Sequence, residues 1–436
     1  MKEKFWKLIY RIIFLPLFFA GVSLGAFFNS KIRAGMRARK NWDQKLIKDL
    51  ARFDRSDKLI WFHSSSLGEF EQAKPIIESL KSKGKYIILV TFFSPSGYEN
   101  SLRYTSADVV AYIPLDTGKN ALRFYEITKP SFAVIMRYDI WPNHVWVAAE
   151  NNVPVFLVDA TMRDKTAKKN IITRSFHRSL YGKMARILTI SESDLKNFRY
   201  FGTDPSRLIK IGDTRFDRVY ERSRVAKTKN LINSEITAGK LITVAGSTWE
   251  EDEEVLVPVI KKLLEYHSDL LFILVPHEPT VYHIEKLEAD FRGVTQTIRF
   301  SHLNNYRNEQ VIIVDSIGIL LTLYSYCDIA FVGGSFKSNV HNVLEAAVYG
   351  VPVIYGPKIN NSQEVGNLTG SGGGFIVRDQ KQMYRLFSRL ITNSAYRSET
   401  GKKAGDFVVT QIGATQIIVD EMLKIMEGRS SESRSA

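Results

Sequence analysis

The chain has 436 residues, more than one typical hydrophobic core needs, and its content of 44% hydrophobic and 24% charged residues is that of an ordinary folded protein. The formal net charge of +14 indicates an anionic partner, such as a nucleic acid, an anionic lipid or a phosphorylated substrate. The one cysteine, Cys327, excludes an intramolecular disulfide and a metal site built from cysteines.

The first forty residues differ in composition from the rest. Residues 12–28 are uncharged and almost wholly apolar, and the residues on both sides of this run are basic. A cleaved signal peptide is disfavoured because no small-x-small cleavage site precedes the basic residues. A membrane-spanning helix needs roughly 20 apolar residues, and an interfacial anchor needs fewer. We expect an uncleaved N-terminal anchor within residues 1–40, either spanning or half-inserted.

More basic residues follow the apolar run than precede it. Lys31, Arg33, Arg37, Arg39 and Lys40 come after it, with no acidic residue among them. By the positive-inside rule this asymmetry places the rest of the chain in the cytoplasm. The same cations would attract the anionic headgroups of a membrane.

Beyond residue 58, short apolar runs alternate with segments of helical periodicity, which is typical of parallel sheets covered by helices. The first half carries predicted strands at 59–63, 86–92, 109–113, 132–136, 153–158, 187–190 and 208–211. The second half carries them at 241–245, 270–275, 311–314, 329–332, 351–355 and 375–377. We therefore expect an α/β protein of two doubly wound domains, with a ligand cleft at the carboxyl ends of their strands.

A polar stretch at 226–240 interrupts this series and is predicted to be a linker. It separates a first domain at 41–225 from a second at 241–427, whose last long helix is expected at 406–426. The tail at 428–436, rich in Ser, Arg and Glu, is expected to be disordered. The sequence has no Walker A loop, and no G-x-G-x-x-G follows the first strand of either half, which disfavours dinucleotide oxidoreduction.

A carboxylate, Glu69, follows the first predicted strand of the first half. At the carboxyl edge of that strand it would point into the cleft, where it could remove a proton from an attacking hydroxyl. The alternative is a capping box, in which Ser66 and Glu69 merely close a helix N-terminus. Local sequence leaves both interpretations open, and Gly68 slightly favours catalysis because a glycine lets a substrate approach.

Two further loops are expected at the same edge. Ser94, Ser96 and Gly97 could hold a phosphate or a sugar with their hydroxyl and N–H groups, although a turn with a helix cap is the simpler explanation of these residues alone. Arg137 and Asp139 precede a tryptophan, and a cation, an acid and an aromatic ring together suit a sugar phosphate.

In the second half, a strand, a polar loop and the start of an expected helix form a predicted phosphate-binding site: Gly333, Gly334, Ser335, His341, Asn342 and Glu345. Glycine N–H groups and a helix N-terminus can hold an anion, and a carboxylate one turn inside the helix can accept bonds from ribose hydroxyls. The alternative is an ordinary crossover in which the glycines serve only packing, and the glycines alone favour it.

Two more residues of the second half follow predicted strands. Ser247 lies in an Ala-Gly-Ser-Thr stretch that is either an anion-binding loop or a plain helix cap. His277 could face the same ligand, although a lone histidine is more often structural. The His and Asp residues show no metal-ligand spacing, so neither a metal nor a cofactor is expected.

Taken in chain order, these motifs resemble the Kdo transferase family, glycosyltransferase family 30. The shared segments are Ser-x-Gly-Glu at 66–69, Ser-Pro-Ser-Gly at 94–97, Trp-Pro-Asn at 141–143, Gly-Asp-Thr-Arg-Phe-Asp at 212–217, Ala-Gly-Ser-Thr at 245–248, Gly-Gly-Ser at 333–335 and His-Asn-x-Leu-Glu at 341–345. The resemblance covers nearly the whole chain. It implies the GT-B fold, with two Rossmann-like domains facing a central cleft and an N-terminal membrane-anchor helix.

The resemblance also implies an activity. The family transfers 3-deoxy-D-manno-octulosonic acid (Kdo) from CMP-Kdo to a tetraacylated lipid A precursor, lipid IVA, in lipopolysaccharide biosynthesis on the cytoplasmic face of the inner membrane. Glu69 would be the general base of an inverting displacement of CMP that uses no metal. Contacts to the CMP-Kdo donor are expected from Ser247, His277, Gly333, Gly334, Ser335, His341, Asn342 and Glu345. Contacts to the lipid acceptor are expected from Ser94, Ser96, Gly97, Arg137 and Asp139.

The chain departs from the family pattern at three places. Asp139-Ile140 stands where Glu-Leu is common, which shortens one carboxylate by a methylene. His277 lacks the arginine that usually precedes it and would contact the donor phosphate. Asn339-Val340 stands where the family often has two glycines.

Three other functions compete with this one. Another membrane-associated GT-B enzyme could use a different nucleotide sugar, but an epimerase of that fold has no reason to carry an anchor. A tethered protein that binds nucleotide sugars or lipids without catalysis is the non-enzymatic alternative. Nucleic-acid binding is disfavoured because the basic residues are dispersed along the chain.

Overall fold

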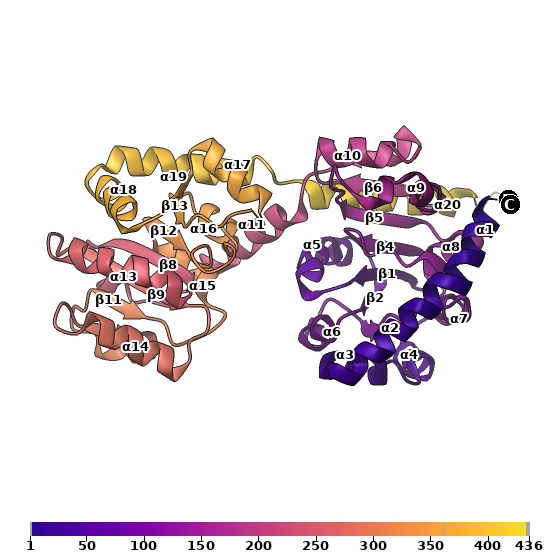
Figure 1. Cartoon of the computed structure of the whole chain (residues 1–436), viewed down its shortest axis with the longest axis horizontal. Helices are drawn as coiled ribbons and strands as arrows, with labels where there is room; N and C mark the ends of the chain where they lie inside the picture. Colours follow the sequence, from indigo (N-terminus) through magenta and orange to yellow (C-terminus); the bar gives the residue numbers. More distant parts are fainter. Residues whose placement is uncertain (1, 361, 433–436) are drawn as a thin grey trace. The chain divides into compact units, whose positions relative to one another are not determined.

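The structure, a computed structural model, describes residues 2–360 and 362–432, and the chain divides into two compact units (Figure 1). The first unit consists of Met1–Arg218 with Ile412–Ala436, and the second of Val219–Gln411. Within the described residues, each unit is built on a seven-stranded parallel sheet with helices packed against it. The expectation of an α/β protein with two Rossmann-like, doubly wound halves is confirmed.

The sheet of the first unit consists of β1 (Lys58–Ser64), β2 (Tyr86–Phe92), β3 (Val109–Tyr112), β4 (Phe132–Met136), β5 (Val155–Ala160), β6 (Arg186–Thr189) and β7 (Leu208–Lys210). They lie in the order β3-β2-β1-β4-β5-β6-β7. Apart from the first residues of β1 and β2, strands β1, β2, β4 and β5 are buried throughout, because helices cover both faces of a parallel sheet. Helices α4 to α10 follow in chain order: α4 (Trp42–Leu50), α5 (Leu67–Lys83), α6 (Pro95–Ser101), α7 (Gly118–Thr128), α8 (Pro142–Glu150), α9 (Ile171–Tyr181) and α10 (Glu192–Arg199).

The C-terminal helix, α20 (Ala414–Glu432), belongs to the first unit. Its side chains Ile418 and Met422 are fully buried in the core between the first sheet and α5. Asp217, in α11 (Thr214–Ala226), caps its start by accepting hydrogen bonds from the N–H groups of Gly413 at 2.7 Å and Thr415 at 3.0 Å. The prediction that the second domain includes this helix is therefore wrong, because the apolar face of α20 completes the core of the first unit.

Two details of the expected boundaries also change. The helix expected at 406–426 is two helices, α19 (Ser394–Val409) and α20, and Gly413 between them has a φ of +122° that L residues rarely adopt. In the stretch predicted to be a linker, Ile232 and Ile236 are buried, and α12 (Ser234–Thr237) forms part of the second unit. The stretch is therefore packed rather than free.

The tail expected to be disordered lies only in part within the described residues. Helix α20 continues to Glu432, and residues 433–436 lie outside the part of the chain that the structure describes.

The sheet of the second unit consists of β8 (Leu241–Thr248), β9 (Leu270–Pro276), β10 (Thr297–Arg299), β11 (Val311–Ile313), β12 (Ile329–Val332), β13 (Val353–Tyr355) and β14 (Gly374–Ile376). Their order is β10-β11-β9-β8-β12-β13-β14. Sequence analysis missed β10, an edge strand of three residues that is too short for an alternating pattern. The helices of this unit, besides α12 and α19, are α13 (Glu250–Leu264), α14 (Val281–Phe291), α15 (Leu320–Leu323), α16 (Leu344–Ala347), α17 (Gln363–Ser371) and α18 (Gln380–Thr392).

In each sheet, the order in which successive strands are added reverses at the first strand. β1 lies between β2 and β4, and β8 lies between β9 and β12. Loops that leave neighbouring strands on the two sides of such a point diverge, so ligands bind at the carboxyl ends of those strands. Glu69, in the first turn of the helix after β1, and Asp139, in the loop after β4, lie at this edge of the first sheet, and Ser247, near the end of β8, and Gly334, in the loop after β12, lie at this edge of the second.

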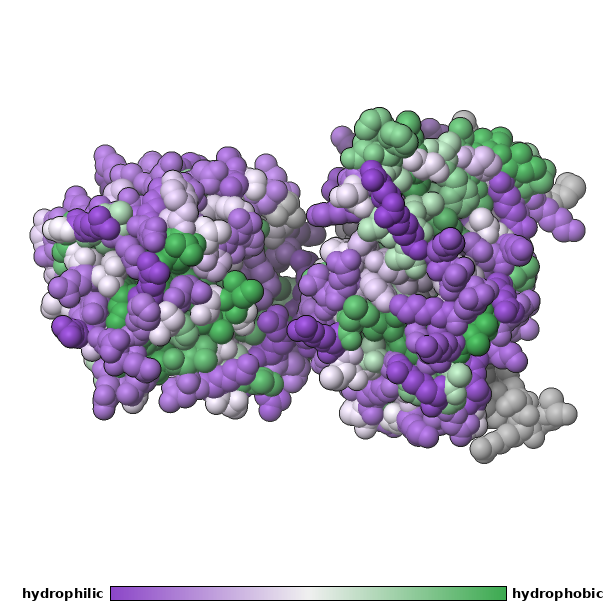
Figure 2. All heavy atoms as spheres, turned by 90° about the horizontal axis from the view of Figure 1, so that it is seen from below, coloured by the Kyte–Doolittle hydropathy of each residue, from purple (hydrophilic) through white to green (hydrophobic). Residues whose placement is uncertain are grey.

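An N-terminal helix, Glu3–Phe28, is long and apolar enough to span a membrane by length and composition. It comprises α1 (Lys2–Ile9), a π-helical turn at Tyr10–Phe14 and α2 (Leu15–Phe28), and α3 (Ser30–Ala38) follows. Figure 2 shows hydrophobic surface gathered along one edge of the unit that carries this helix. The expectation of an apolar N-terminal helix is confirmed, and its contact with a membrane remains a prediction.

Candidate active site

Glu69 lies in the first turn of α5, next to the carboxyl end of β1. Its carboxylate is buried, with 7% of the residue exposed, and Oε2 accepts a hydrogen bond of 2.6 Å from the N–H group of Ser65. The side chain of Ser66, the N-cap residue, makes no capping hydrogen bond. The capping box considered in the sequence analysis is therefore not formed, because neither of its two reciprocal hydrogen bonds is present.

The charge state of Glu69 depends on its surroundings. Burial raises the pKa of Glu69 above its ordinary value of 4.5. The Ser65 N–H group lowers this pKa, the charge of Asp139 raises it, and the charges of His63 and Arg137 lower it. A carboxylate with a raised pKa is a better proton acceptor than an exposed one, as a general base requires.

Asp139, at the end of β4, is held by a chain of hydrogen bonds from inside the unit. Trp61 donates to Thr91 Oγ1 at 2.8 Å, Thr91 Oγ1 lies 2.9 Å from His63 Nδ1, and His63 Nε2 lies 2.8 Å from Asp139 Oδ2. Because an ionised carboxylate can only accept a hydrogen bond, His63 Nε2 carries a proton and donates it to Asp139. Burial would raise the pKa of Asp139, but the hydrogen bonds from His63 and from Trp141 hold it below 3.8.

The two carboxylates therefore differ in their affinity for a proton. Asp139 stays ionised, whereas the pKa of Glu69 is moved up toward the range in which a group can accept and release a proton. Such a separation of the pKa values of neighbouring acids is typical of sites where one acid transfers protons and the other keeps a fixed negative charge.

Arg137 follows β4 in the left-handed backbone region, with a φ of +58°. Its backbone N–H group donates to Val158 at 2.7 Å, and its Nε atom is buried without a hydrogen-bond partner in the described part of the chain. Its charge lowers the pKa of both Glu69 and Asp159, so the guanidinium lies near both carboxyl groups. A buried guanidinium nitrogen without a partner is suited to bind an anion.

The loop after β2 is less suited to ligand binding than expected. Ser94 is the N-cap of α6, and its Oγ accepts a hydrogen bond of 3.1 Å from Gly97 N–H. Gly97 is buried against the ring of Phe92, where a Cβ would collide with the ring. Only Ser96 is exposed, so the simpler explanation, a helix cap, accounts for Ser94 and Gly97.

A buried acidic pair in the same unit was not recognised from the sequence. Asp159, after the regular part of β5, has a φ of +50° and accepts a hydrogen bond from Thr214 Oγ1. Burial raises its pKa, and the nearby Asp213 raises it further. Asp213 itself accepts two hydrogen bonds from Arg215 at 2.9 and 2.6 Å. Asp159 lies within the buried strand β5, and no local sequence signal marks an acid in such a strand as functional.

In the second unit, the glycine pair after β12 does not offer the N–H groups that the sequence analysis assigned to a phosphate. Gly333 N–H donates to Gly246 at 2.9 Å, and Gly334 N–H donates to Asp252 Oδ2 at 2.7 Å. Phe336 N–H donates to the other oxygen of Asp252 at 3.1 Å. The prediction that these glycine N–H groups bind a phosphate is wrong, because the N–H group of Gly334 already donates to the buried carboxylate of Asp252 and that of Gly333 to the carbonyl of Gly246.

The glycines are required for packing instead. A Cβ at Gly333 would collide with the backbone of Ser247, and one at Gly334 would collide with the backbone of Asn339. Gly334 also has a φ of +94°, which favours glycine. Ser335 is fully buried and accepts a hydrogen bond of 2.6 Å from Gly356 N–H, so its hydroxyl faces the protein interior.

The helix after this loop is shorter than predicted. α16 begins at Leu344 rather than at His341 and has one turn. Asn342 is exposed, and its Oδ1 accepts a hydrogen bond of 3.2 Å from Leu344 N–H. Glu345 is partly exposed, and Arg222 Nη1 lies 3.6 Å from its Oε1. Asn342 and Glu345 are therefore exposed enough to contact a ligand, but Asn342 does not lie at the N-terminus of the helix as predicted.

Aromatic rings and a lysine gather beside these residues. The rings of His277 and His341 stack with their centroids 4.4 Å apart, and the centroids of the Trp249 and His277 rings are 4.6 Å apart. Trp249 Nε1 donates to His341 Nε2 at 3.0 Å, and Lys337 Nζ lies 3.7 Å from the centroid of the Trp249 ring. Burial and the neighbouring His277 lower the pKa of His341 to about 4, so His341 is neutral and can accept this bond. We name these four residues the histidine stack.

Ser247 keeps its place as a candidate contact. It lies where the register of β8 with β9 shifts, and it has a φ of +54°, which is uncommon for a serine. α13 begins after Trp249, so Ser247 is not the helix cap that was the alternative explanation. Strained backbone of this kind persists where the surrounding structure fixes it, often at binding sites.

The sequence analysis missed Asp252, Trp249 and Lys337. The acidic start of α13 was visible, but the pattern does not tell which of its acids turns inward to the loop after β12. Trp249 and Lys337 lie on separate segments, and only the folded unit brings them to His277.

Comparisons with known proteins agree with this architecture. The family model of 3-deoxy-D-manno-octulosonic-acid transferase (kdotransferase) matches residues 40–218. The 3-deoxy-D-manno-octulosonic acid transferase of Aquifex aeolicus is 30% identical over 339 residues, which cover 76% of this chain and 86% of that protein. The enzyme of the same name from Haemophilus influenzae is 26% identical over 378 residues, which cover 84% and 87% of the two chains.

Among solved structures, UDP-GlcNAc 2-epimerase from Neisseria meningitidis has a TM-score of 0.57 at 15% identity and covers 84% of this chain and 100% of its own. At this level of identity the likeness concerns the fold alone, and it agrees with the expected GT-B fold, which is built from two Rossmann-like units. The sequence comparisons are more specific. They show that the chain belongs to the Kdo transferase family of glycosyltransferases.

Proposed function

We propose that this protein transfers Kdo from CMP-Kdo to a lipid A precursor such as tetraacylated lipid IVA, with inversion at the anomeric carbon. The observation that carries the proposal is Glu69, a buried carboxylate with a raised pKa at the carboxyl edge of the first sheet. The family supports the transferred sugar, since the relatives compared above are Kdo transferases.

Glu69 acts as the general base. Its ionised carboxylate accepts the proton of an acceptor hydroxyl while the hydroxyl oxygen attacks the anomeric carbon of Kdo. The new C–O bond forms on the side opposite the phosphate, and the bond between the anomeric carbon and the phosphate oxygen breaks. CMP leaves with that electron pair, and Glu69 keeps the proton. Asp139 supports this role because its fixed negative charge raises the proton affinity of Glu69.

The first unit binds the acceptor in this proposal. Arg137 has a buried Nε without a partner in the described residues, which suits a phosphate of the lipid A precursor. Ser96 is an exposed polar residue in the first turn of α6 and contacts the sugar. Ser94 and Gly97 hold the shape of that loop.

The second unit binds CMP-Kdo. Ser247, Asn342 and Glu345 contact the nucleotide, and His277 and His341 lie beside them. Lys337 supplies the positive charge that the family arginine before His277 would otherwise provide. Glycines 333 and 334 act indirectly, because Gly333 allows close approach to the backbone of Ser247 at the end of β8 and Gly334 allows close approach to the backbone of Asn339 in its own loop.

The protein works at a membrane in this account. The apolar helix Glu3–Phe28 and the +14 charge suit an anionic bilayer that contains a phosphorylated lipid substrate. In this proposal both units lie on the cytoplasmic face of the inner membrane, where the basic residues after the helix contact anionic headgroups.

A transfer assay tests the proposed function. Membranes that contain the full chain are incubated with CMP-Kdo and tetraacylated lipid A precursor, and the reaction is followed by CMP release and by the mass of the lipid. We expect stoichiometric CMP and a lipid heavier by at least one Kdo residue. A parallel reaction with UDP-GlcNAc tests the alternative donor. Transfer from UDP-GlcNAc but not from CMP-Kdo would refute the proposal.

A further inference from the structure

The N-terminal helix is bound to the first unit over its first half. Tyr10 is buried, and its hydroxyl donates to Asp116 Oδ2 at 2.8 Å. Trp6 Nε1 donates to Ser175 Oγ at 3.1 Å, and Arg11 Nε donates to Asn143 Oδ1 at 2.8 Å. These contacts make the segment up to Leu15 part of the folded unit.

The second half of this helix is apolar and exposed. Leu17 is 69% exposed, Phe27 is 80% exposed and Phe28 is 83% exposed. Residues 16–28 are roughly 20 Å long as an α-helix, whereas the hydrocarbon core of a bilayer is about 30 Å thick. Because the first half is bound to the unit, the remaining residues are too short to span the bilayer, and we expect this part of the helix to lie in the membrane interface.

A cavity of about 500 Å³ lies between the bound half of the helix and the unit beneath it. Aromatic side chains form much of its wall: Trp6, Phe14, Phe18, Trp141 and Phe176. Phe14 and Phe18 belong to the apolar run of the helix, so the cavity borders the membrane-facing segment. A volume of this size is typical of ligand pockets and is rare in a close-packed interior.

The cavity reaches the candidate active site. Asp139 lines it, and the same carboxylate bonds to His63 and raises the pKa of Glu69. Lys168 also lines it and carries a positive charge near Asp139. A ligand that fills the cavity would be apolar along most of its length and anionic or polar at the end near Glu69.

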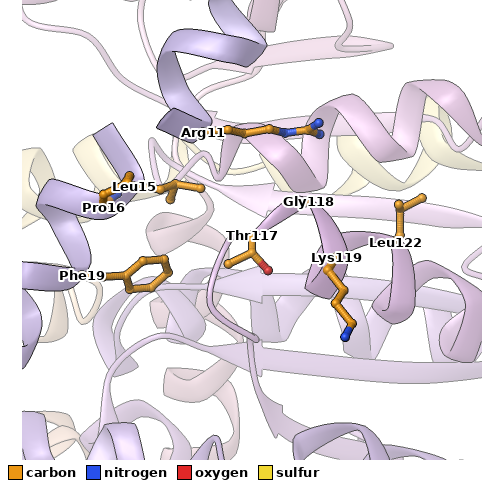
Figure 3. Close-up of a pocket in the computed structure, with 8 residues that line it drawn as sticks. All are labelled: Arg11, Leu15, Pro16, Phe19, Thr117, Gly118, Lys119 and Leu122. Atoms are coloured by element: carbon orange, nitrogen blue, oxygen red, sulfur yellow. The ribbon is translucent and has the colours of Figure 1, made fainter. Parts of the chain in front are cut away.

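A second hollow lies on the other side of the same helix, and its lining differs. It has a volume of about 570 Å³, and Arg11 and Lys119 contribute charged side chains to it beside Leu15 and Phe19 (Figure 3). Two cations in the wall make it a poor site for a hydrocarbon chain.

We propose that the aromatic cavity binds one acyl chain of the lipid acceptor and thereby sets the acceptor sugar against Glu69. This inference rests on the proposed function, because it takes the acceptor to be an acylated sugar. The cavity then fixes the position of the sugar relative to the acyl chain. The chain enters from the membrane interface along Phe14 and Phe18, and the sugar stays at the end that Asp139 lines. Burying each methylene of the chain would strengthen binding roughly fourfold.

A matched pair of substitutions on the helix tests the cavity. Ile9 lines it, whereas its neighbour Leu8 is 58% exposed and does not. In Ile9→Trp the larger ring fills part of the cavity, so we expect kcat/KM for the tetraacylated acceptor to fall at least tenfold. Leu8→Trp should stay within twofold of the wild type. With a deacylated acceptor sugar, all three proteins should have the same kcat/KM, since that substrate leaves the cavity empty.

A binding measurement separates this inference from the proposed function. Radiolabelled dodecanoic acid in equilibrium dialysis should bind to the wild type and to Leu8→Trp, and bind at least tenfold more weakly to Ile9→Trp. Equal binding by all three proteins, or equal losses of transfer in both variants, would overturn the acyl-chain site. A wild type that binds dodecanoic acid selectively but forms no Kdo-lipid would keep the site and refute the proposed transfer.

Discussion

His63 Nε2 lies 2.8 Å from Asp139 Oδ2, and this hydrogen bond keeps a negative charge beside Glu69. Burial alone would raise the pKa of Asp139, but the bonds from His63 and Trp141 lower it below 3.8. The resulting charge contributes to the raised pKa of Glu69. His63, which the sequence analysis placed only at the end of a predicted strand, thus acts on the candidate base through Asp139.

The charge of Asp139 should be visible in the pH dependence of transfer. In Asp139→Asn the negative charge is lost, so the pKa of Glu69 falls and the base is ionised at lower pH. We expect the acid limb of the kcat/KM profile to move to lower pH, together with a lower plateau because the hydrogen bond to His63 changes. An acid limb that stays in place or moves to higher pH would show that Asp139 does not act on the group that titrates.

Burial of Asp159 should make stability depend on pH. Its pKa is raised in the folded state, so the ionised form is disfavoured there. The free energy of unfolding should therefore fall as the pH rises from the ordinary pKa of 3.8 through the raised folded value, and Asp159→Asn should reduce this fall. Urea unfolding at a series of pH values measures both proteins. If the free energy of unfolding changed with pH in the same way in both proteins, Asp159 would not be the source of this pH dependence.

The cap on the last helix should stabilise the first unit. Asp217→Ala removes the acceptor for the N–H groups of Gly413 and Thr415. We expect a loss of about 1–2 kcal/mol in the free energy of unfolding, measured in urea. Asp420→Ala is the control, because this exposed carboxylate on the same helix makes only surface contacts with Lys83 and Gln416. Equal losses in the two variants would argue against the cap.

Lys337 should affect donor binding more than acceptor binding. In Lys337→Ala, the histidine stack loses its positive charge, so we expect the KM for CMP-Kdo to rise about tenfold with little change in the KM for the lipid. Lys262→Ala is a matched control, because Lys262 also lies over an aromatic ring, that of Tyr384, 4.5 Å from its centroid. A rise in the KM for CMP-Kdo of the same size in both variants would contradict a donor role for Lys337.

Much of the fold could be predicted because buried parallel strands are short apolar runs that stand out from the helices between them. The prediction failed for β10, whose three residues show no period, and for α20. The apolar face of α20 shows that the helix is covered, but it does not show which sheet covers it. The hydrogen bonds of Asp217 and the buried side chain of Met422 settle that question, and both are contacts distant in sequence.

The candidate site was predictable where residue type and strand edge suffice, as for Glu69, Arg137 and Asp139. It was not predictable where another side chain takes the position of the ligand. Gly334 has the conformation expected of an anion-binding loop, yet Asp252 supplies the anion from within the protein. The docking of the N-terminal helix was also hidden, because its bond from Tyr10 to Asp116 joins segments far apart in the chain.

The most direct test of the account is the single-turnover rate of Kdo transfer in Glu69→Gln, which keeps the size of the side chain and removes its basicity. Glu71→Gln is the control, since Glu71 lies on the same helix and forms surface ion pairs with Lys74 and Arg218. We predict that Glu69→Gln slows transfer by roughly 10²–10⁴-fold while CMP-Kdo still binds, and that Glu71→Gln stays near the wild-type rate. A folded Glu69→Gln protein that transfers Kdo at the wild-type rate would contradict the central claim.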